Sequence, residues 1–412
     1  MKRVFKRILL FQSLISMVFF APLALSAEIM AGFAHLDITP PTGGQTTGYR
    51  NALVTDGIHD PTSAHMVVLE IDQYSVAMAI CDLCIFNSPW LREEVRGLSD
   101  DHFLLVNTHT HAGPSMQQND FPSAEKPWRL TVEERILATL RKTLNKLFPA
   151  HFAASRGELQ LGYNRLVRQP EGHALTHFEN PERISYGSVD PTVTVTRAND
   201  VSGAVRLVLV SEACHLVALG PRNCKISAGF RGVLRNRIEG KLSNDTRCVY
   251  IKGGAGDINP LFLPRSDDPQ DDFADMEAMG DLLTEKVLPI LERMGMKGGG
   301  ADSLEVRSKV IEVDHRFIAK ESVTLGATSI LINGDISIVT MPGEPFHLFQ
   351  DYLRDRAALP NTFFFGYCSN EGYPWPSYVP DLMSAARGGY GASDTTQAAV
   401  GTGGRLLNLG VS

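Results

Sequence analysis

Two histidines at alternate positions are the residues of this chain that most directly indicate chemistry. His109 and His111 follow the apolar run 103–106 and precede a Gly-Pro pair. Because alternate side chains of an extended segment point to the same face, both imidazoles should project together from the end of a strand. Paired imidazoles in that position suit metal binding or proton transfer. Taken alone, such a pair is more often two surface histidines in a loop.

Two more candidate ligands follow predicted strands. His215 comes after the run 206–210, and Glu344 lies in a Pro-Gly-Glu-Pro turn after the run 337–341. A single histidine after a strand is usually a satisfied core residue, and a single glutamate before a helix usually complements the helix dipole. Imidazoles and a carboxylate that gather at strand ends are instead the ligands of catalytic zinc sites, which keep a position for water.

A tyrosine-rich segment near the C-terminus is a third candidate. It contains Tyr367, Tyr373, Tyr378 and Tyr390. A tyrosine beside a metal can coordinate it or donate a hydrogen bond to a tetrahedral oxyanion. Without such a context, a tyrosine usually packs as an amphipathic side chain.

The elements that must position these residues alternate irregularly between strands and helices, which favours a mixed α/β fold over a regular parallel sheet. Thr131 and Glu134 form a capping-box pattern at the start of one helix, and Pro289 should kink or break another. We expect sheets of mixed strand direction flanked by helices, in one large catalytic domain. The predicted helices cover 131–147, 230–242, 275–294 and 346–356, and the predicted strands cover 65–71, 75–82, 103–106, 206–210, 247–251, 337–341 and 362–367.

The first 27 residues are predicted to be a signal peptide, followed by a domain at 28–412. Four basic residues precede an apolar stretch that ends in small residues. The formal net charge of −7 becomes −11 once those four positive charges are removed. Such an acidic chain is a poor nucleic-acid binder and gains little from anionic membrane surfaces. We therefore expect an exported protein, periplasmic or secreted, without a transmembrane segment after cleavage.

Six cysteines remain in the domain, and their pairing stays open. Cys81 and Cys84 form a CxxC motif, but no second CxxC follows, so a structural zinc knuckle is not predicted. Cys214 and Cys224 are candidates for a disulfide in an oxidising compartment.

Several motifs in chain order resemble the neutral, non-lysosomal ceramidase family. The resemblance spans about 32–409, and its strongest part is the Asn-Thr-His-Thr-His-Ala-Gly-Pro segment, which is similar to the family's THTHSGP signature. Single motifs of this length would be weak, but the ordered set is specific. The matching segments are 32–40, 57–60, 107–114, 164–165, 256–260, 342–344 and 390–393.

The resemblance implies a set of roles for individual residues. It implies Zn²⁺ held by His109, His215, Glu344 and Tyr378. Tyr378 is preferred over Tyr373 because it stands twelve residues before Tyr390, as the family pattern expects. His111 is implied as a proton-transfer residue beside the ion. Arg165 and Tyr390 are implied to contact the scissile amide or its oxyanion. Asp82 is either a partner of this site or a buried structural carboxylate.

The activity implied by the resemblance is zinc-dependent hydrolysis of the N-acyl amide bond of ceramide or a ceramide-like lipid. The alternatives are a hydrolase of a smaller N-acyl amide or amino sugar, and a non-catalytic metal- or ligand-binding protein on the same fold. The residues Phe363, Phe364, Phe365, Tyr367 and Trp375 are candidates to line an apolar substrate groove, although a buried strand is the favoured interpretation of the Phe run.

Two departures from the family pattern bear on the substrate. Members of that family carry an additional C-terminal β-sandwich domain and a long insertion that contains a serine implicated in activity. Here the corresponding loop, 264–268, is short, and Ser266 is only a weak counterpart. The metal site is therefore better supported by the sequence than ceramide as the substrate.

Overall fold

The computed structural model describes residues 28–72, 74–96, 102–243, 245–264, 269–295, 302–369 and 375–411. The predicted signal peptide, Ser266 and Tyr373 lie outside these residues. Within them, no helix combines the length and apolarity that crossing a membrane requires. The six cysteines all lie in the described part and are free there, so a Cys214–Cys224 disulfide is absent from it.

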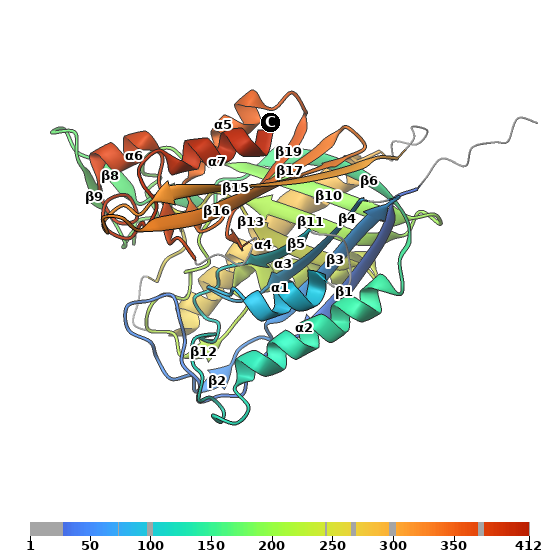
Figure 1. Ribbon diagram of the computed structural model, residues 1–412. Coiled ribbons are helices and arrows are strands. Elements are labelled where there is room, and N and C mark those ends of the chain that lie inside the picture. Colours follow the sequence, from blue (N-terminus) through green and yellow to red (C-terminus); the bar gives the residue numbers. More distant parts are fainter. Residues whose placement is uncertain are drawn as a thin grey trace, which may run out of the picture.

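A nine-stranded sheet forms the centre of the molecule (Figure 1). Neighbouring strands are antiparallel except for the pairs β4–β5 and β11–β13, which are parallel. In order across the sheet, the strands are β13 (Arg247–Lys252), β11 (Val205–Glu212), β10 (Thr192–Asp200), β6 (Phe148–Glu158), β1 (Met30–Asp37), β3 (Ser63–Ile71), β4 (Tyr74–Cys81), β5 (Phe103–Asn107) and β20 (Cys368–Ser369).

A four-stranded sheet packs against one face of the larger sheet. Its β17 and β19 are parallel, and its other neighbouring strands are antiparallel. In order, its strands are β15 (Leu304–Asp314), β16 (Ser322–Ile332), β17 (Ile336–Thr340) and β19 (Asn361–Phe365).

Helices cover the outer face of each sheet, so the layers run helix, sheet, sheet, helix (Figure 1). Helices α1 (Pro89–Arg96), α2 (Trp128–Leu144), α3 (Phe230–Leu242) and α4 (Pro269–Arg293) pack on the nine-stranded sheet. Helices α5 (His347–Arg356) and α7 (Thr402–Val411) pack on the four-stranded sheet, and the short α6 (Leu382–Arg387) lies near the C-terminus.

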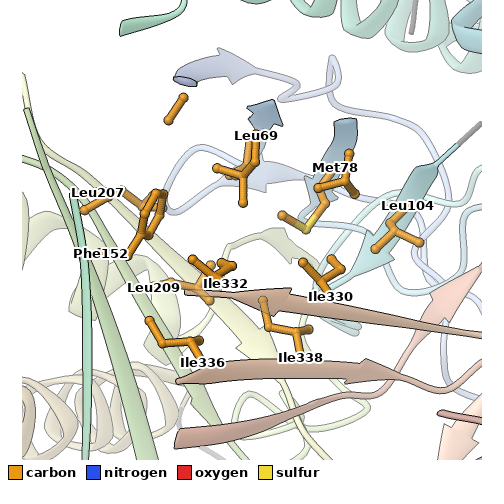
Figure 2. Packing of buried hydrophobic residues seen from close by; sticks show 14 of the residues in the cluster. Leu69, Met78, Leu104, Phe152, Leu207, Leu209, Ile330, Ile332, Ile336 and Ile338 are labelled. Atoms are coloured by element: carbon orange, nitrogen blue, oxygen red, sulfur yellow. The ribbon is translucent and has the colours of Figure 1, made fainter. Parts of the chain in front are cut away.

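The alternation of side chains along the strands fills both interfaces. On β4, Met78 and Ile80 join the cluster between the sheets, whereas Ala77 and Ala79 face the cluster beneath α1 and α2. Figure 2 shows the inter-sheet cluster, with Leu69 and Met78 on one side and Ile330 and Ile338 on the other. A strand that is apolar on both faces is what a doubly covered sheet requires.

The mixed α/β class with sheets of mixed strand direction is confirmed, and the predicted strands are all present. The predicted capping box is wrong, and the helix that contains Pro289 is not broken there. Helix α2 begins at Trp128 after Pro127, with no side-chain cap, so Thr131 and Glu134 do not form a capping box. Helix α4 begins at Pro269 and continues through Pro289 to Arg293. The core contacts of the side chains on either side of the proline offset the lost backbone hydrogen bond.

Four short two-stranded pairs organise the loops at the strand ends. Three of them join segments that are distant in the sequence, and one of these three carries the candidate site residues Glu344 and Tyr378. The pairs are β2 (Gly57–Ile58) with β12 (Lys225–Ile226), β7 (Gly162–Asn164) with β14 (Ile258–Pro260), β8 (Leu166–Arg168) with β9 (Ala174–Thr176), and β18 (Glu344–Pro345) with β21 (Tyr378–Val379).

The buried His65 predicts a pH dependence of stability. Neither ring nitrogen of His65 has a partner among the described residues, and burial holds the pKa of this imidazole well below its ordinary value. Below pH 6.5, His65 therefore binds a proton in the unfolded chain but stays neutral in the folded chain. The free energy of unfolding should fall by up to about 1.4 kcal/mol per pH unit from this group alone.

Replacement of His65 by Leu removes that contribution. Denaturant titrations from pH 7.5 to 5 should show the stability of His65→Leu falling less steeply than that of the wild type. The matched control is His173→Leu, which changes an exposed histidine and should follow the wild-type curve. Parallel curves for wild type and His65→Leu would contradict the interpretation.

Candidate metal centre

The candidate site lies where the segments after several strands meet. His109 follows β5, His215 follows β11 and Glu344 follows β17. The segment after β19 joins the end of β5 to the end of β13. The backbone N–H of Asn107 donates to the carbonyl of Tyr367 at 3.0 Å, and Gly366 N–H donates to the carbonyl of Lys252, at the end of β13, also at 3.0 Å.

Two backbone carbonyls orient His109 and His215. The Nδ1 of His109 lies 2.7 Å from the carbonyl oxygen of Cys84. The Nδ1 of His215 lies 3.1 Å from the carbonyl oxygen of Ile258. A carbonyl only accepts, so each Nδ1 carries the proton and each Nε2 keeps a free lone pair. This is the arrangement by which proteins fix the tautomer of a metal-binding histidine.

The backbone at His109 is held in the left-handed region. Its φ is +62°, which is unusual for a residue other than glycine. Its N–H donates to the carbonyl of Leu83 at 2.9 Å, and Thr108 N–H donates to the carbonyl of Cys81 at 2.9 Å. A strained backbone of this kind persists only where contacts with the surrounding structure hold it in place. Such residues are concentrated at functional sites.

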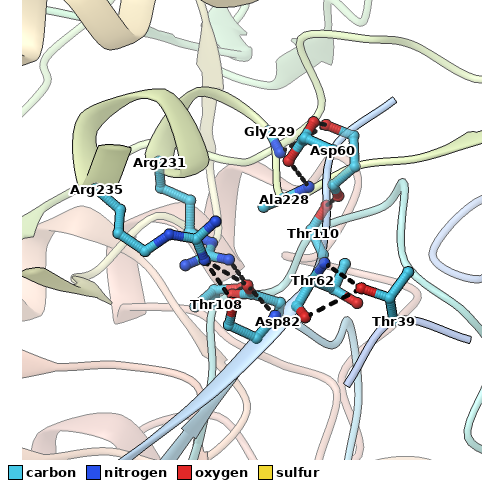
Figure 3. Close-up of polar contacts among 12 residues, drawn as sticks. Thr39, Asp60, Thr62, Asp82, Thr108, Thr110, Ala228, Gly229, Arg231 and Arg235 are labelled. Atoms are coloured by element: carbon cyan, nitrogen blue, oxygen red, sulfur yellow. Dashed lines mark hydrogen bonds and ion pairs between the residues drawn. The ribbon is translucent and has the colours of Figure 1, made fainter. Parts of the chain in front are cut away.

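Asp82 anchors the loop that carries His109 (Figure 3). Its carboxylate accepts from the Thr108 hydroxyl at 3.2 Å and from the backbone of Ser63 at 2.7 Å, and it forms a fully buried ion pair with Arg231. Arg235 lies 3.8 Å from the same carboxylate. The structure therefore places Asp82 among the supports of the metal-site loop rather than at the site itself.

A second carboxylate supports the loop from the other side (Figure 3). Asp60 accepts from the backbone N–H of Ala228 at 2.8 Å and from the hydroxyl of Ser227. The carbonyl of Ser227 in turn accepts from the Thr110 hydroxyl at 3.1 Å. The residue between the two candidate histidines is thereby fixed.

The carboxylate of Glu344 meets both imidazoles. Its Oε2 lies 3.2 Å from the Nε2 of His109 and 3.2 Å from the Nε2 of His215. The turn before Glu344 depends on Gly343, whose φ is +71° and where a Cβ atom would stand 2.4 Å from the carbonyl oxygen of Ser377. Glycine alone suits that position.

The three converging atoms are suited to hold a cation between them. Both Nε2 atoms present lone pairs, and the carboxylate oxygen is also an acceptor, so their close approach is repulsive without a positive charge. Two ligands of a tetrahedral zinc ion, each about 2.0–2.1 Å from it, lie roughly 3.3 Å apart. The observed spacing of 3.2 Å fits this value. His109, His215 and Glu344 therefore match the donor set of a divalent ion.

Burial keeps the site in the protonation state that metal binding needs. It lowers the pKa of His109 and lowers the pKa of His215 well below its ordinary value. The histidines are thus neutral at neutral pH, which leaves their Nε2 lone pairs available to a metal ion.

His111 lies beside the three donors. Its ring centroid is 4.8 Å from that of His109 and 4.7 Å from that of Tyr49. Both ring nitrogens are sealed from solvent, and neither has a partner among the described residues. A buried imidazole that lacks partners in the protein is available to a ligand or a substrate.

Arg165, Tyr378 and Tyr390 form a second group next to the donors. Tyr378 stands opposite Glu344 in the β18–β21 pair, and its ring packs against the guanidinium of Arg165. The guanidinium lies 5.3 Å from the ring centroid of Tyr378 and 5.1 Å from that of Tyr390. The structure thus brings all seven residues of the predicted site into one region.

The Asn-Arg pair is held by the Gly-Asp turn at 256–257. Arg165 donates to the carbonyl of Gly256 at 2.6 Å and to the side chain of Asn259 at 3.2 Å. Asn164 donates to the carboxylate of Asp257 at 2.9 Å, and His347 lies 2.7 Å from that carboxylate. Both sequence motifs therefore serve to position one guanidinium.

Sequence reasoning missed two residues at this site. Cys84 was considered only as half of a CxxC motif, yet its sulfur lies 3.5 Å from the Nδ1 of His109. Lys252 ends a buried strand with its Nζ 4.3 Å from the ring centroid of Tyr367 and without a partner among the described residues. Burial lowers the pKa of Lys252 to about 7. The charged last residue of the otherwise apolar run 248–252 was the available signal.

The proposed donor set makes a direct prediction about metal binding. His109→Ala and Glu344→Gln should each abolish stoichiometric Zn²⁺ or Co²⁺ binding measured by calorimetry. The loss should exceed the 10–100-fold that removal of an outer-shell partner costs. His173→Ala, on an exposed turn, is the control and should bind as the wild type does. Unchanged affinity in both site variants, with circular dichroism like that of the wild type, would rule out this donor set.

Comparisons with known proteins agree with this arrangement at the level of fold. No family model and no curated protein sequence matches the chain. The solved structure of neutral ceramidase from Pseudomonas aeruginosa superposes with a TM-score of 0.71 and 17% identity, over 93% of this chain and 74% of that one. A structure described as ceramidase complexed with C2 gives a TM-score of 0.71 and 16% identity over the same shares of the two chains. The chain therefore has the neutral ceramidase fold.

Proposed function

We propose that the protein is a zinc-dependent amidohydrolase that cleaves the N-acyl amide bond of a ceramide-like lipid. The observation that carries the proposal is the convergence of His109, His215 and Glu344, three buried groups that could hold a divalent ion. When bound, such an ion lowers the pKa of a water molecule and polarises a carbonyl group.

Tyr378 is the proposed fourth ligand. It is paired with Glu344 across β18 and β21, so its position depends on that of a proposed ligand. Burial raises the pKa of the Tyr378 phenol well above its ordinary value, whereas the neighbouring Arg165 acts in the opposite direction. A divalent ion would add a second positive charge in favour of the phenolate.

Arg165 and Tyr390 are suited to hold the carbonyl oxygen of the amide. The guanidinium is fully charged and is clamped by Gly256 and Asn259, so it offers preorganised donors without reorganisation. Its Nε has no partner among the described residues and is free for a substrate oxygen. The half-buried Tyr390 lies beside this guanidinium, 5.1 Å from it to the ring centroid, and would add a phenol donor.

His111 is the proposed proton carrier. Burial, together with His109 and His215, lowers its pKa well below the ordinary value, so the ring enters the reaction neutral and able to accept a proton. Delivery of that proton to the leaving nitrogen would complete the cleavage of the C–N bond.

The ceramide assignment is supported by the two superposed structures, which are described as ceramidases. The Phe run does not contribute a groove: Phe363 and Phe365 fill the core between the sheets, and Phe364 faces the opposite cluster. Tyr367 and Trp375, by contrast, lie against His109. A smaller N-acyl amide is the alternative substrate.

Location is part of the proposal. Export through a signal peptide at residues 1–27 would place the enzyme in the periplasm or outside the cell, where it meets lipid substrates.

The test measures metal content and acyl release together. The purified protein should contain about one zinc ion and release fatty acid from a labelled ceramide. Chelation should abolish hydrolysis, and zinc should restore it. A short N-acyl amine and an N-acyl amino sugar, assayed in parallel, distinguish the alternative substrates. Stoichiometric zinc without hydrolysis of any of these amides would refute the enzymatic proposal.

Two conservative variants test the proposed roles of Arg165 and Tyr390. Tyr390→Phe and Arg165→Lys should each lower kcat by about 10²–10³-fold if they stabilise charge that develops in the transition state. Zinc content should stay at the wild-type level in both, because neither side chain is a proposed ligand. A change confined to KM would assign these residues to uniform substrate binding instead.

A further inference from the structure

Three buried polar groups near the candidate metal centre have no hydrogen-bond partner among the described residues. They are the Nζ of Lys252, the hydroxyl of Tyr367 and the indole Nε1 of Trp375. The side chains of Lys252 and Tyr367 are fully buried. Because buried polar atoms in proteins are nearly always paired, three unpaired groups in one place indicate a missing ligand.

The three groups lie together beside one proposed metal ligand. The Nζ of Lys252 lies over the ring of Tyr367, 4.3 Å from its centroid. The ring centroids of Tyr367 and Trp375 are 6.3 Å apart. Both rings also pack against the imidazole of His109, at centroid distances of 4.7 Å for Tyr367 and 6.3 Å for Trp375. A ligand that reaches these groups would therefore adjoin the candidate metal centre.

All three groups can donate hydrogen bonds. An ammonium group and an indole nitrogen only donate, and a phenol donates readily. The cation–π contact with Tyr367 stabilises the charge of Lys252 but leaves its N–H groups without an oxygen acceptor. The missing ligand must therefore be rich in acceptor atoms.

The carboxylates around Lys252 are engaged by other groups. Glu344 contacts the two imidazoles of the candidate metal centre, and Glu212 accepts from the hydroxyl of Tyr250 at 2.6 Å. Burial lowers the pKa of Lys252 to about 7, although Glu344 acts in the opposite direction. An anion beside the amine would favour its charged form further.

The charges at the site also favour an anionic ligand. Arg165 and Lys252 bring two buried cationic groups to the surroundings of Glu344, and a divalent ion would add more positive charge. A positive potential in a buried site selects an anion over a neutral molecule of the same shape. The acceptor atoms of the ligand are therefore expected to carry negative charge.

We propose that Lys252, Tyr367 and Trp375 bind a carboxylate that the substrate carries next to its scissile amide, so that the substrate is an N-acyl amino acid. The inference rests on the proposed function and narrows it to the smaller N-acyl amides. The ammonium of Lys252 would pair with the carboxylate, and the phenol and indole would donate to it. The hydroxyl groups of a neutral ceramide would form weaker hydrogen bonds with the same donors.

Two octanoyl amides of similar size test the proposal by calorimetry. N-octanoylglycine carries a carboxylate where N-octanoylethanolamine carries a hydroxymethyl group. Metal-free protein is used so that the carboxylate cannot bind an ion directly. The wild type should bind N-octanoylglycine about 10–100-fold more tightly, the range expected for a hydrogen-bonded charged group.

Variants assign that preference to the three groups. Lys252→Met should remove it, and Tyr367→Phe, which keeps the ring and loses the hydroxyl, should reduce it. Lys142→Met is the matched control, because it changes an exposed lysine on α2 and should keep the wild-type preference. Equal binding of the two amides by the wild type, or an undiminished preference in folded Lys252→Met, would overturn the proposal.

Hydrolysis by the zinc-loaded protein separates this inference from the proposed function. Lys252→Met should lower kcat/KM for N-octanoylglycine about 10–100-fold more than for N-octanoylethanolamine. An equal loss for the two amides would assign Lys252 to balancing the charge of Glu344 and would refute the carboxylate subsite. A Lys252-dependent preference in binding, without hydrolysis of either amide, would support the subsite and refute only the proposed function. Hydrolysis of both amides without any preference would refute only the subsite.

Discussion

The arrangement of the whole site depends on one electrostatic constraint: three buried acceptor atoms are held within contact distance of one another. When neither Nε2 atom is protonated, the lone pairs of His109 and His215 repel the carboxylate of Glu344. The surrounding structure resists that repulsion. Backbone carbonyls fix both imidazoles, a glycine-dependent turn fixes the carboxylate, and buried Asp82 holds the loop between them. These contacts hold the three candidate ligands close together in the folded chain.

Much of the architecture was accessible from the sequence because its strands are short, apolar and bounded by turn residues. The mixed sheets and helices 230–242 and 346–356 follow from that pattern, and the superposition on ceramidase structures agrees with the motif-based resemblance. The site residues were accessible for a related reason. His109, His215 and Glu344 each directly follow a strand, and polar side chains at that position are seldom required by the core.

The parts that the sequence did not predict depend on contacts between distant segments. Thr131 and Glu134 look like a helix start, but Pro127 begins the helix earlier, since burial of Trp128 and Val132 adds a turn. Pro289 looks like a helix break, but core packing around it carries α4 past that point. Cys84 and Lys252 are unremarkable in their own segments, and only the meeting of β4, β5 and β13 ends places them beside His109 and Tyr367.

The chain between Asn361 and Ser369 belongs first to one sheet and then to the other. It forms β19 of the four-stranded sheet and, after Gly366 and Tyr367, pairs with β5 as β20. The crossing bonds directly to Asn107, two residues before His109. Sliding of one sheet over the other would therefore pull on the histidine loop. The apolar layer between the sheets, which includes Phe363, thus helps to fix the spacing of the candidate metal ligands.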